Sequence, residues 1–423
     1  MRERIAVIGS GIAGMGVAWQ LRQNADVTLI ERDTRPGGHT NTVFVEEDGE
    51  QIPIDTGFIV FNHSTYPNLI QLFKELGVEI KPAEMSFSVQ HIPDGLEYNG
   101  MGPDKLFAQR KNILNPRFHS LIVQILRFFG LARKGLKNPE FLECTVGEFA
   151  RRHGLGTDFL NHYLVPMSSA VWSTEPGRIL DFPALSLIRF FQNHGFLGIT
   201  THHPWFTVCG GSRTYMGKIL STLDPVRLPA KVVDVRESDK AATVRIDDGS
   251  TLDFDRVIIA AHADEALAML GSPDDAQKQL LGAFRYQRNV ATLHTDSHVM
   301  PGARKAWASW NYRVDRDHEG NTQATTHYWM NALQGVSKKK NYFVSVNGEA
   351  SIPPEAILYQ TVYEHPVFTL NAMRAQESLP SLNTRASTQR IFFCGSYFRY
   401  GFHEDAYKSA VDAAAVIRPL IRA

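Results

Sequence analysis

Short apolar runs alternate with helical patterns at the start of the chain. Residues 5–8 (IAVI) contain no polar position, which is typical of a parallel strand buried on both faces. A helical pattern follows over residues 15–23, and residues 27–30 form a second strand-like run that ends at Glu31. This strand–helix–strand order predicts the first unit of an α/β fold with a parallel sheet.

Glycines fill the turn between the first strand and the helix. In residues 9–14 (GSGIAG), the first glycine permits a tight turn, the second a close approach of the backbone to a pyrophosphate, and the third close packing of helix on strand. The free N–H groups at the helix start favour phosphate, and Glu31 is placed to accept hydrogen bonds from ribose hydroxyls. The pattern predicts a dinucleotide cofactor contacted by Gly9, Ser10, Gly11, Ile12, Ala13, Gly14, Glu31 and Arg32.

Two further strings resemble those of flavoproteins. Residues 35–42 (RPGGHTNT) resemble the RxGGRxxS/T box of the amine-oxidase and phytoene-desaturase superfamily, in which paired glycines bring backbone N–H groups to phosphate oxygens. This chain has His39 where amine oxidases usually have Arg. Residues 55–59 (DTGFI) resemble the turn that runs beneath the flavin ring. The resemblance implies FAD contacts at Arg35, Gly37, Gly38, His39, Thr40, Gly57, Phe58 and Ile59.

The second half of the chain is expected to return to the same cofactor site. Residues 208–223 resemble the re-entry into an FAD-binding domain, and residues 256–261 (RVIIAA) resemble its last strand before the chain leaves again. The strand-like residues 391–394 and the helical residues 404–417 resemble the final motif of the superfamily. These strings imply cofactor contacts at Val232, Ala260, Gly395, Ser396, Glu404, Asp405 and Ala406.

Over nearly its whole length, the chain resembles the bacterial amine-oxidase-like proteins known as predicted NAD/FAD-binding proteins. These are related to a desaturase of methyl-branched acyl chains in furan fatty acid formation. The strings that carry the resemblance are residues 306–312, 327–334, 365–368 and 401–405. The resemblance implies an FAD-dependent oxidoreductase, a lipid acyl chain such as a methyl-branched fatty acyl phospholipid as substrate, and a cyclopropane-fatty-acid synthase-like methyltransferase as functional partner.

The expected architecture is α/β, with a Rossmann-like FAD-binding domain of the amine-oxidase (GR2) type and an inserted α+β substrate or cap domain. The cofactor strings place the discontinuous FAD-binding domain in residues 1–82, 205–275 and 385–423. The intervening segments, 83–204 and 276–384, are expected to form the cap. The active site then lies between the two domains.

Bulky apolar residues in the first cap segment and directly after it favour a hydrophobic substrate. Trp172 and the pairs 190–191, 196–197 and 205–206 are the main examples. For any one of them, ordinary hydrophobic core is the more common role. Taken together, they favour an apolar substrate, for which they could line a tunnel.

Residues 117–137 combine apolar positions at helical spacing with a basic end. The apolar face comprises Phe118, Leu121, Ile122, Ile125, Phe128 and Phe129. Two interpretations stay open: a helix that lies on anionic lipid in peripheral contact with a membrane, or a cap helix with a solvated basic end.

Four polar residues are candidates for catalysis. His403, Glu404 and Tyr400 are expected near the flavin if the final motif aligns as in its relatives, and each is a candidate base. A loop-stabilising hydrogen bond is an equally good explanation for His403. Asn311 is a candidate for the face opposite the flavin, where aromatic walls exclude water.

Composition narrows the function classes. A formal net charge of +0 disfavours nucleic-acid binding, and three isolated cysteines disfavour a disulfide framework or a zinc site. Adjacent residues such as His202 and His203 point apart, so no metal is expected there either. With no signal-peptide pattern and no run of about 18 apolar residues, a cytoplasmic location is expected, at the inner face of the membrane if residues 117–137 contact lipid.

Four functions stay open at this point. The leading one is an FAD-dependent dehydrogenase or desaturase of a hydrophobic substrate. The second is an amine oxidase on a small amine, although residues 284–295 lack the lysine that such enzymes often carry there. The third is a flavin-dependent isomerase, and the fourth is a non-catalytic, membrane-associated, flavin-binding partner of the methyltransferase.

Overall fold

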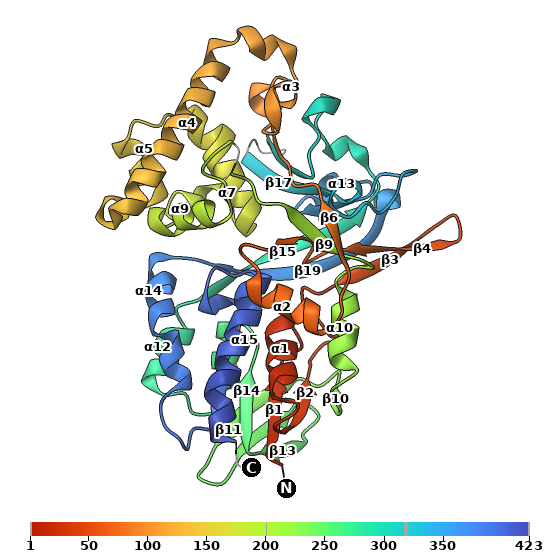
Figure 1. The fold of residues 1–423 in the computed structure, drawn as a ribbon, viewed down its shortest axis with the longest axis vertical. Helices are drawn as coiled ribbons and strands as arrows, with labels where there is room; N and C mark the ends of the chain where they lie inside the picture. Colours follow the sequence, from red (N-terminus) through yellow and green to blue (C-terminus); the bar gives the residue numbers. More distant parts are fainter. Residues whose placement is uncertain (1, 200, 317–319, 321, 422–423) are drawn as a thin grey trace.

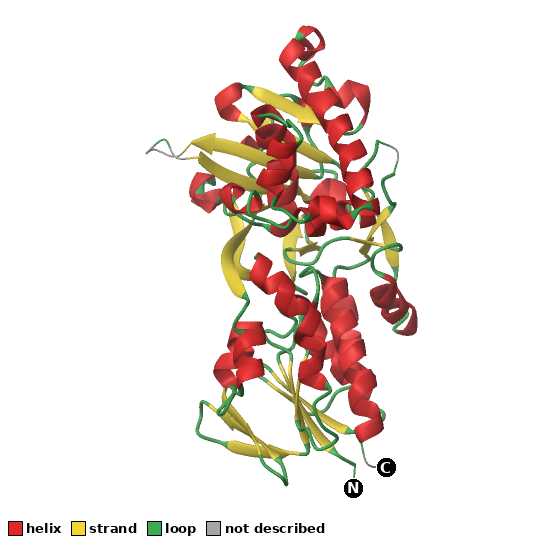
Figure 2. Ribbon diagram, turned by 90° about the vertical axis from the view of Figure 1, so that its left-hand side faces the viewer, coloured by secondary structure: helices red, strands yellow, loops and turns green. Residues whose placement is uncertain are grey.

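In the computed structural model, which describes residues 2–199, 201–316, 320 and 322–421, the chain forms two halves. Figure 1 shows a sheet with its helices in the lower half, together with both termini, and a second sheet with a group of helices in the upper half. Figure 2 shows the same division after a quarter turn, with strands and helices in both halves.

A five-stranded parallel sheet organises the lower half. Its strand order is β10-β2-β1-β14-β20, and every neighbouring pair is parallel. Four of the five residues of β1 are buried, as expected for a strand covered on both faces. The strands are β1 (Arg4–Ile8), β2 (Asp26–Ile30), β10 (Val226–Arg227), β14 (Arg256–Ile259) and β20 (Ile391–Phe393).

Helices and a small antiparallel sheet cover this parallel sheet. Helices α1 and α15 pack closely on one another, and the three-stranded sheet β11-β12-β13 is an antiparallel meander. The helices are α1 (Ile12–Leu21), α2 (Pro67–Glu75), α10 (Arg213–Leu220), α11 (Ala263–Met269) and α15 (His403–Ile417). The meander strands are β11 (Val232–Glu237), β12 (Ala242–Ile246) and β13 (Thr251–Phe254).

A mixed seven-stranded sheet organises the upper half, in the order β19-β15-β18-β17-β16-β7-β8. Only the β16–β7 pair is parallel among these described strands. The strands are β7 (Phe87–His91), β8 (Leu96–Asn99), β15 (Arg285–His294), β16 (Trp310–Arg316), β17 (Thr322–Trp329), β18 (Phe343–Val346) and β19 (Ile357–Val367). The helices of this half are α3 (Gly102–Leu106), α4 (Pro116–Lys137), α5 (Val146–Arg152), α6 (Thr157–Phe159), α7 (Val165–Trp172), α8 (Pro176–Ile179), α9 (Ala184–Asn193) and α13 (Met330–Gln334).

Short strands link the two halves. A hairpin of β3 (Thr42–Glu47) and β4 (Glu50–Asp55) and a small sheet in the order β5-β9-β6 lie near the boundary between them. The strands of the small sheet are β5 (Phe61–Asn62), β6 (Ile80–Ala83) and β9 (Trp205–Val208).

Two helices of the segment predicted as the second cap piece lie in the lower half. Helices α12 (Asp275–Leu281) and α14 (Leu370–Ser378) pack on one another and lie beside α15 in Figure 1. The turn that follows α14 contacts β20. The chain between 276 and 384 therefore contributes to both halves. Its strand β15 begins near the boundary, and its strand β19 returns to the boundary and ends there.

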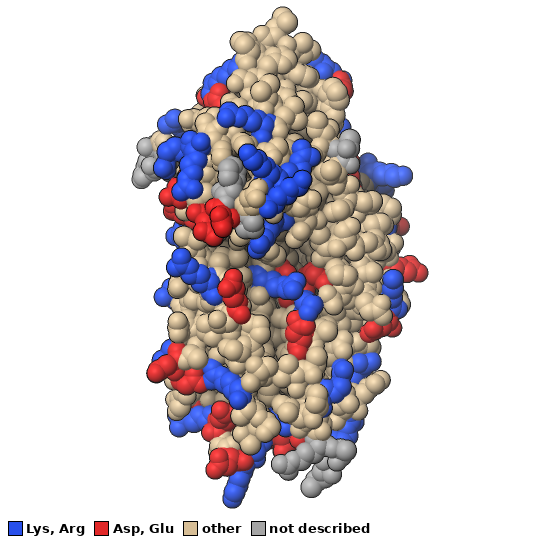
Figure 3. Space-filling view, turned by 60° about the vertical axis from the view of Figure 1, so that its left-hand side comes forward, with Lys and Arg blue, Asp and Glu red and all other residues tan. Residues whose placement is uncertain are grey.

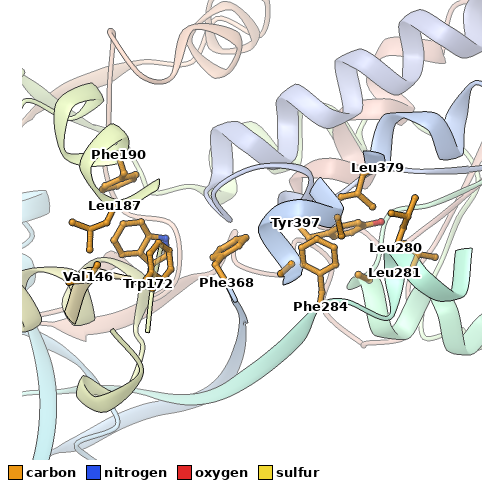
Figure 4. Close-up of a cluster of buried hydrophobic side chains, with 14 of the residues drawn as sticks. Val146, Trp172, Leu187, Phe190, Leu280, Leu281, Phe284, Phe368, Leu379 and Tyr397 are labelled. Atoms are coloured by element: carbon orange, nitrogen blue, oxygen red, sulfur yellow. The ribbon is translucent and has the colours of Figure 1, made fainter. Parts of the chain in front are cut away.

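The two halves share one hydrophobic core cluster. Figure 4 shows Phe368 between a group around Trp172 and Phe190 in the upper half and a group around Phe284 and Tyr397 in the lower half. Fully burying a large apolar side chain contributes about 1.5–3 kcal/mol. The shared core therefore fixes how the two halves face one another across the boundary.

The predicted amphipathic helix over residues 117–137 is present as α4, but its apolar stripe faces inward. Phe118, Leu121, Phe128 and Phe129 are all buried within the shared core. Of the two interpretations left open, the one in which this stripe faces lipid is therefore wrong, because other cap helices cover the stripe. Among the described residues, no helix is both long enough and apolar enough to cross a membrane.

Candidate functional site

One large cavity, of about 950 Å³, lies at the boundary between the two halves. Its walls begin at the glycine turn after β1 and extend past the starts of α11 and α15 to cap helices α4, α7 and α9. In the space-filling view of Figure 3, the surface is hollowed near mid-height, where acidic and basic side chains edge the hollow. The cavity therefore joins the predicted cofactor site to the cap.

The start of α1 forms an anion-binding cradle in this cavity. Gly11 is the N-cap, no side chain caps the helix, and no acidic residue lies in its first turn. A Cβ atom on Gly11 would meet nothing within 4 Å, so the space in front of it is open. A Cβ on Gly14 would instead overlap the carbonyl oxygen of Gly9. The free N–H groups and the helix dipole make this turn suitable for a pyrophosphate.

Glu31 is held in place at the end of β2. Its Oε2 accepts hydrogen bonds from the backbone N–H (2.8 Å) and the hydroxyl (2.5 Å) of Ser10, and its Oε1 accepts from the N–H of Asp33 (2.9 Å). Each carboxylate oxygen has a further lone pair. Glu31 lines the cavity, so it can also accept from a ribose hydroxyl.

Arg35 supports the neighbouring glycine loop from outside the cavity. Its guanidinium donates to the carbonyl oxygens of Pro36 (3.1 Å), Gly38 (2.8 Å) and Thr40 (3.2 Å). Gly37 and Gly38 both have positive φ, at 109° and 57°, which glycine adopts without strain. Arg35 therefore shapes the loop, whereas the sequence predicted a direct cofactor contact.

Two histidines from distant segments meet on the cavity wall. His39 Nε2 and His365 Nε2 are 3.2 Å apart. The backbone N–H of Val290 donates to Asn347 Oδ1, Asn347 Nδ2 donates to Asn289 Oδ1, and Asn289 Nδ2 donates to His365 Nδ1 (2.9, 2.8 and 2.7 Å). These three successive hydrogen bonds make His365 Nδ1 an acceptor. His365 Nε2 therefore carries the proton and donates to His39.

Burial keeps both of these rings neutral. It lowers the pKa of His365 to about 4, and the pKa of His39 falls well below 6.5 because of burial and the neighbouring imidazole. His39 also stacks on Tyr363, with ring centroids 4.5 Å apart. At neutral pH, His39 therefore offers an uncharged ring at the position where amine oxidases usually have Arg.

His403 lies in a tight polar and aromatic setting at the start of α15. Its Nε2 lies 2.6 Å from the hydroxyl of Tyr215, and its ring stacks on Phe58 with centroids 3.9 Å apart. Burial lowers its pKa to about 3 and raises that of Tyr215 well above 10. The phenol therefore donates to the imidazole, and His403 is a poor proton acceptor.

Three other predicted polar residues lie outside the cavity wall. Glu404 accepts from the start of α2, and Asp405 accepts from the backbone N–H of Phe402 in its own helix start (3.0 Å). Asn311 is buried, and its amide bonds Ser88 and the backbone of Ala308 and His327. The side chains of Glu404, Asp405 and Asn311 therefore serve the fold, and the predicted catalytic roles of Glu404 and Asn311 do not fit these positions. The predicted cofactor contact at Glu404 and Asp405 concerns the backbone N–H groups of the helix start and stays a prediction.

The cavity wall contains most of the remaining predicted residues. Gly14, Gly37 and Thr40 lie behind it, where they pack or support the loops. The predicted residues on the wall are Gly9, Ser10, Gly11, Ile12, Ala13, Glu31, Arg32, Gly38, His39, Gly57, Phe58, Ile59, Val232, Ala260, Gly395, Ser396, Tyr400, His403 and Ala406.

Several wall residues were not predicted. Lys231 directly precedes the predicted Val232, and His262 lies two residues after the predicted Ala260, so both are close to residues that the sequence had singled out. Glu265 forms an ion pair with Arg32 at the cavity edge. His365 and Tyr363 belong to β19, and no local pattern connects that strand to the glycine loop.

Residues 12–418 match the protein family described as flavin containing amine oxidoreductase. The chain belongs to this family. It is thus an FAD-dependent oxidoreductase, and the residues present fit that cofactor: the open space before Gly11 accommodates a pyrophosphate and Glu31 a ribose. The predicted fold class, enzyme class and cofactor are confirmed.

Two coproporphyrinogen III oxidases match this flavin-containing amine oxidoreductase at 25% and 23% identity. Coproporphyrinogen III oxidase of Bacillus subtilis (strain 168) is 23% identical over 318 residues, which cover 64% of this chain and 62% of that protein. The chain spans less than two thirds of the length of the curated relatives that it matches.

Two solved structures share the fold over nearly the whole chain. A CLA-producing fatty acid isomerase from P. acnes has a TM-score of 0.68 at 15% identity, with 98% of both chains covered. Cyclohexylamine oxidase from Brevibacterium oxydans IH-35A has a TM-score of 0.68 at 17% identity, with 99% of both chains covered. Sharing this fold does not select among substrates.

Proposed function

We propose that this enzyme dehydrogenates a hydrophobic acyl chain, such as that of a methyl-branched fatty acyl phospholipid. The observation that carries the proposal is the composition of the cap side of the cavity. Among the described wall residues between 85 and 205, none is Asp, Glu, Lys or Arg. The wall there is dominated by apolar side chains, of which Ile122, Ile125, Phe129, Met167, Val171 and Trp172 are examples.

This wall suits an uncharged chain better than a small amine. A cationic amine loses much of its hydration on entering an apolar cavity, and that cost is offset only by a nearby carboxylate or similar partner. The histidines on this part of the wall do not carry charge either: burial lowers the pKa of His194 to about 4 and lowers that of His202 below 6.5. An acyl chain, by contrast, gains free energy from each methylene that leaves water.

The protein itself binds the substrate, orients it, and keeps water away from the reacting C–H bond. Trp172, Phe190 and Phe402 pack against one another at the junction of the cap and the cofactor side, with centroid distances of 4.6–6.3 Å. Aromatic walls of this kind exclude water from the reacting C–H bond. When bound, FAD supplies the acceptor for a hydride from substrate. Because His403 and His365 are weakly basic, they serve to orient groups and do not take up a proton.

The proposed reaction removes two hydrogens from the chain and forms a C=C bond: one leaves as a hydride to bound FAD, and the other leaves as a proton to solvent water at the exposed edge of the cavity. An external electron acceptor must then regenerate the oxidised enzyme. A methyltransferase of the cyclopropane-fatty-acid synthase type is the proposed functional partner, because it would supply the methyl-branched acyl chain.

The test is anaerobic mixing of the FAD-loaded enzyme with phospholipid that carries methyl-branched acyl chains, while the flavin absorption is followed. Loss of the oxidised-flavin absorption, with one C=C bond formed per flavin reduced, supports the proposal. Bleaching by polyamines but not by lipid would replace it with amine oxidation. A moved double bond with no net flavin reduction would replace it with isomerisation.

A further inference from the structure

The cap side of the cavity reaches the protein surface at three apolar residues. Met101, Leu126 and Ile199 all line the cavity, yet they are 42%, 45% and 72% exposed. They come from the loop before α3, from α4 and from the segment after α9. We call the opening among them the cap mouth. A water-exposed mouth lined by Met, Leu and Ile is unfavourable unless something apolar covers it.

Further exposed apolar side chains continue this surface. Ile113 (48% exposed) and Leu114 (88%) lie in the turn before α4, and Val123 (62%) lies on α4 itself. His119 of α4 lies on the same side of the helix as Val123, one turn later, and its Nε2 lies 2.7 Å from the carbonyl oxygen of Ile113, so the turn before α4 lies against this side of the helix. The apolar surface therefore extends from the cap mouth along the outside of α4.

This surface lies in a strongly basic stretch. Residues 101–137 contain eight Lys or Arg and a single acidic residue, Asp104, which is paired with Arg110 and Lys305. Lys111, Arg127, Arg133 and Lys137 are exposed and have no carboxylate partner among the described ion pairs. Figure 3 shows many Lys and Arg side chains on the upper half, around a broad uncharged surface. The combination of exposed Leu, Ile and Val with nearby cations is complementary to an anionic bilayer.

We propose that this face of α4 and its preceding turn rests on an anionic lipid bilayer, and that an acyl chain enters the cavity from the bilayer through the cap mouth. The entry step rests on the proposed function. Leu114, Ile113 and Val123 insert among the acyl chains, while Lys111, Arg127, Arg133 and Lys137 contact the headgroups. A chain that passes directly from bilayer to cavity is never exposed to water, which removes the main barrier to extracting a long-chain lipid.

The docking test is co-sedimentation of the FAD-loaded protein with vesicles of phosphatidylcholine containing one quarter phosphatidylglycerol. The expected result is binding that falls about tenfold or more on pure phosphatidylcholine vesicles or at 0.5 M salt. The double variant Leu114→Asp/Val123→Asp and the double variant Arg133→Glu/Lys137→Glu should each reduce binding to a similar extent. Leu370→Asp, at a 46% exposed leucine on α14, is the matched control and should bind like the unchanged protein.

Two results would overturn the proposal. The first is an unchanged protein that stays in solution with the anionic vesicles, or an L114D/V123D variant that binds as well as L370D. The second is a dimer in solution that L114D/V123D converts to a monomer, which would assign the apolar face to a second copy of the chain.

The two proposals fail differently. Vesicle binding without flavin bleaching by any lipid would support the docking proposal and contradict acyl dehydrogenation. Bleaching by detergent-dispersed lipid, with no vesicle binding and equal rates for L114D/V123D and L370D, would retain dehydrogenation and remove docking.

Discussion

The carboxylate of Glu404 on α15 accepts a hydrogen bond from the backbone N–H of Leu69 in the first turn of α2, at 2.9 Å. Its other oxygen accepts from the backbone N–H (3.0 Å) and side-chain amide (2.6 Å) of Asn68. The N-cap position of α2 is Tyr66, which provides no side-chain cap. Glu404 therefore supplies, from the far end of the chain, the cap that α2 lacks.

We expect Glu404→Ala to lower the free energy of unfolding by about 2–3 kcal/mol, since it leaves helix N–H donors without an acceptor. Glu404→Gln should cost less, because its amide oxygen can still accept. Urea unfolding of both variants measures the difference. An E404A enzyme of normal stability whose rate at saturating FAD is nevertheless abolished would contradict the capping role and restore a catalytic one.

Because the space before Gly11 is open, a small side chain there is expected to weaken FAD binding without affecting the fold. Gly11→Ala adds a methyl group that meets no protein atom within 4 Å, so the apoprotein should keep its melting temperature. The same methyl group would occupy the pyrophosphate cradle and weaken FAD binding by about 10- to 100-fold. Calorimetric titration of the apoprotein with FAD measures this effect. Gly217→Ala on α10, where a Cβ is also unobstructed, is the control and should bind FAD normally.

The apolar cap side of the cavity predicts that a charge there blocks the substrate but not the cofactor. Val171→Asp, on the cavity wall of α7, should lower the rate of flavin bleaching by acyl lipid by about 30-fold or more, because a carboxylate opposes entry of an apolar chain. The flavin content of the purified variant should stay at one per chain. A V171D enzyme with an unchanged bleaching rate would place the substrate elsewhere.

His327 is expected to cause part of the loss of stability of the fold at low pH. It is buried in the upper sheet, where its ring nitrogens lie 2.6 Å from Ser345 Oγ and 2.9 Å from Thr325 Oγ1, and burial lowers its pKa to about 3. The unfolded chain protonates this ring near pH 6.5, whereas the folded chain does not. Its contribution to stability is therefore complete above pH 6.5 and is lost as the pH falls toward 3.

We expect His327→Asn to flatten the pH dependence of the free energy of unfolding between pH 6.5 and 4. The slope should fall by up to about 1.4 kcal/mol per pH unit, which corresponds to one proton. His298→Asn, at an exposed position, is the control. Parallel curves for H327N and the unchanged protein would mean that the folded state also protonates His327.

The sequence by itself determined the cofactor half-site, because that site is built from neighbours along the chain. Strand, glycine turn, helix, second strand and Glu31 all lie within residues 4–31, and each glycine has a local geometric reason. The apolar runs likewise predicted the later strands β14 and β20 of the parallel sheet. Family resemblance added FAD, since the paired-glycine string and the final motif recur in fixed order.

Only the tertiary structure decided what the polar side chains and the helix α4 do. The Glu404 and Arg35 side chains look like cofactor ligands in their strings, yet their side-chain hydrogen bonds go to α2 and to loop carbonyls. His39 meets His365, more than three hundred residues later, through strand pairings that no local pattern encodes. Helical spacing showed that α4 has an apolar face, but not which neighbour covers it. Burial depends on elements distant in sequence, so the buried stripe and the exposed apolar surface of the same helix could be told apart only after folding.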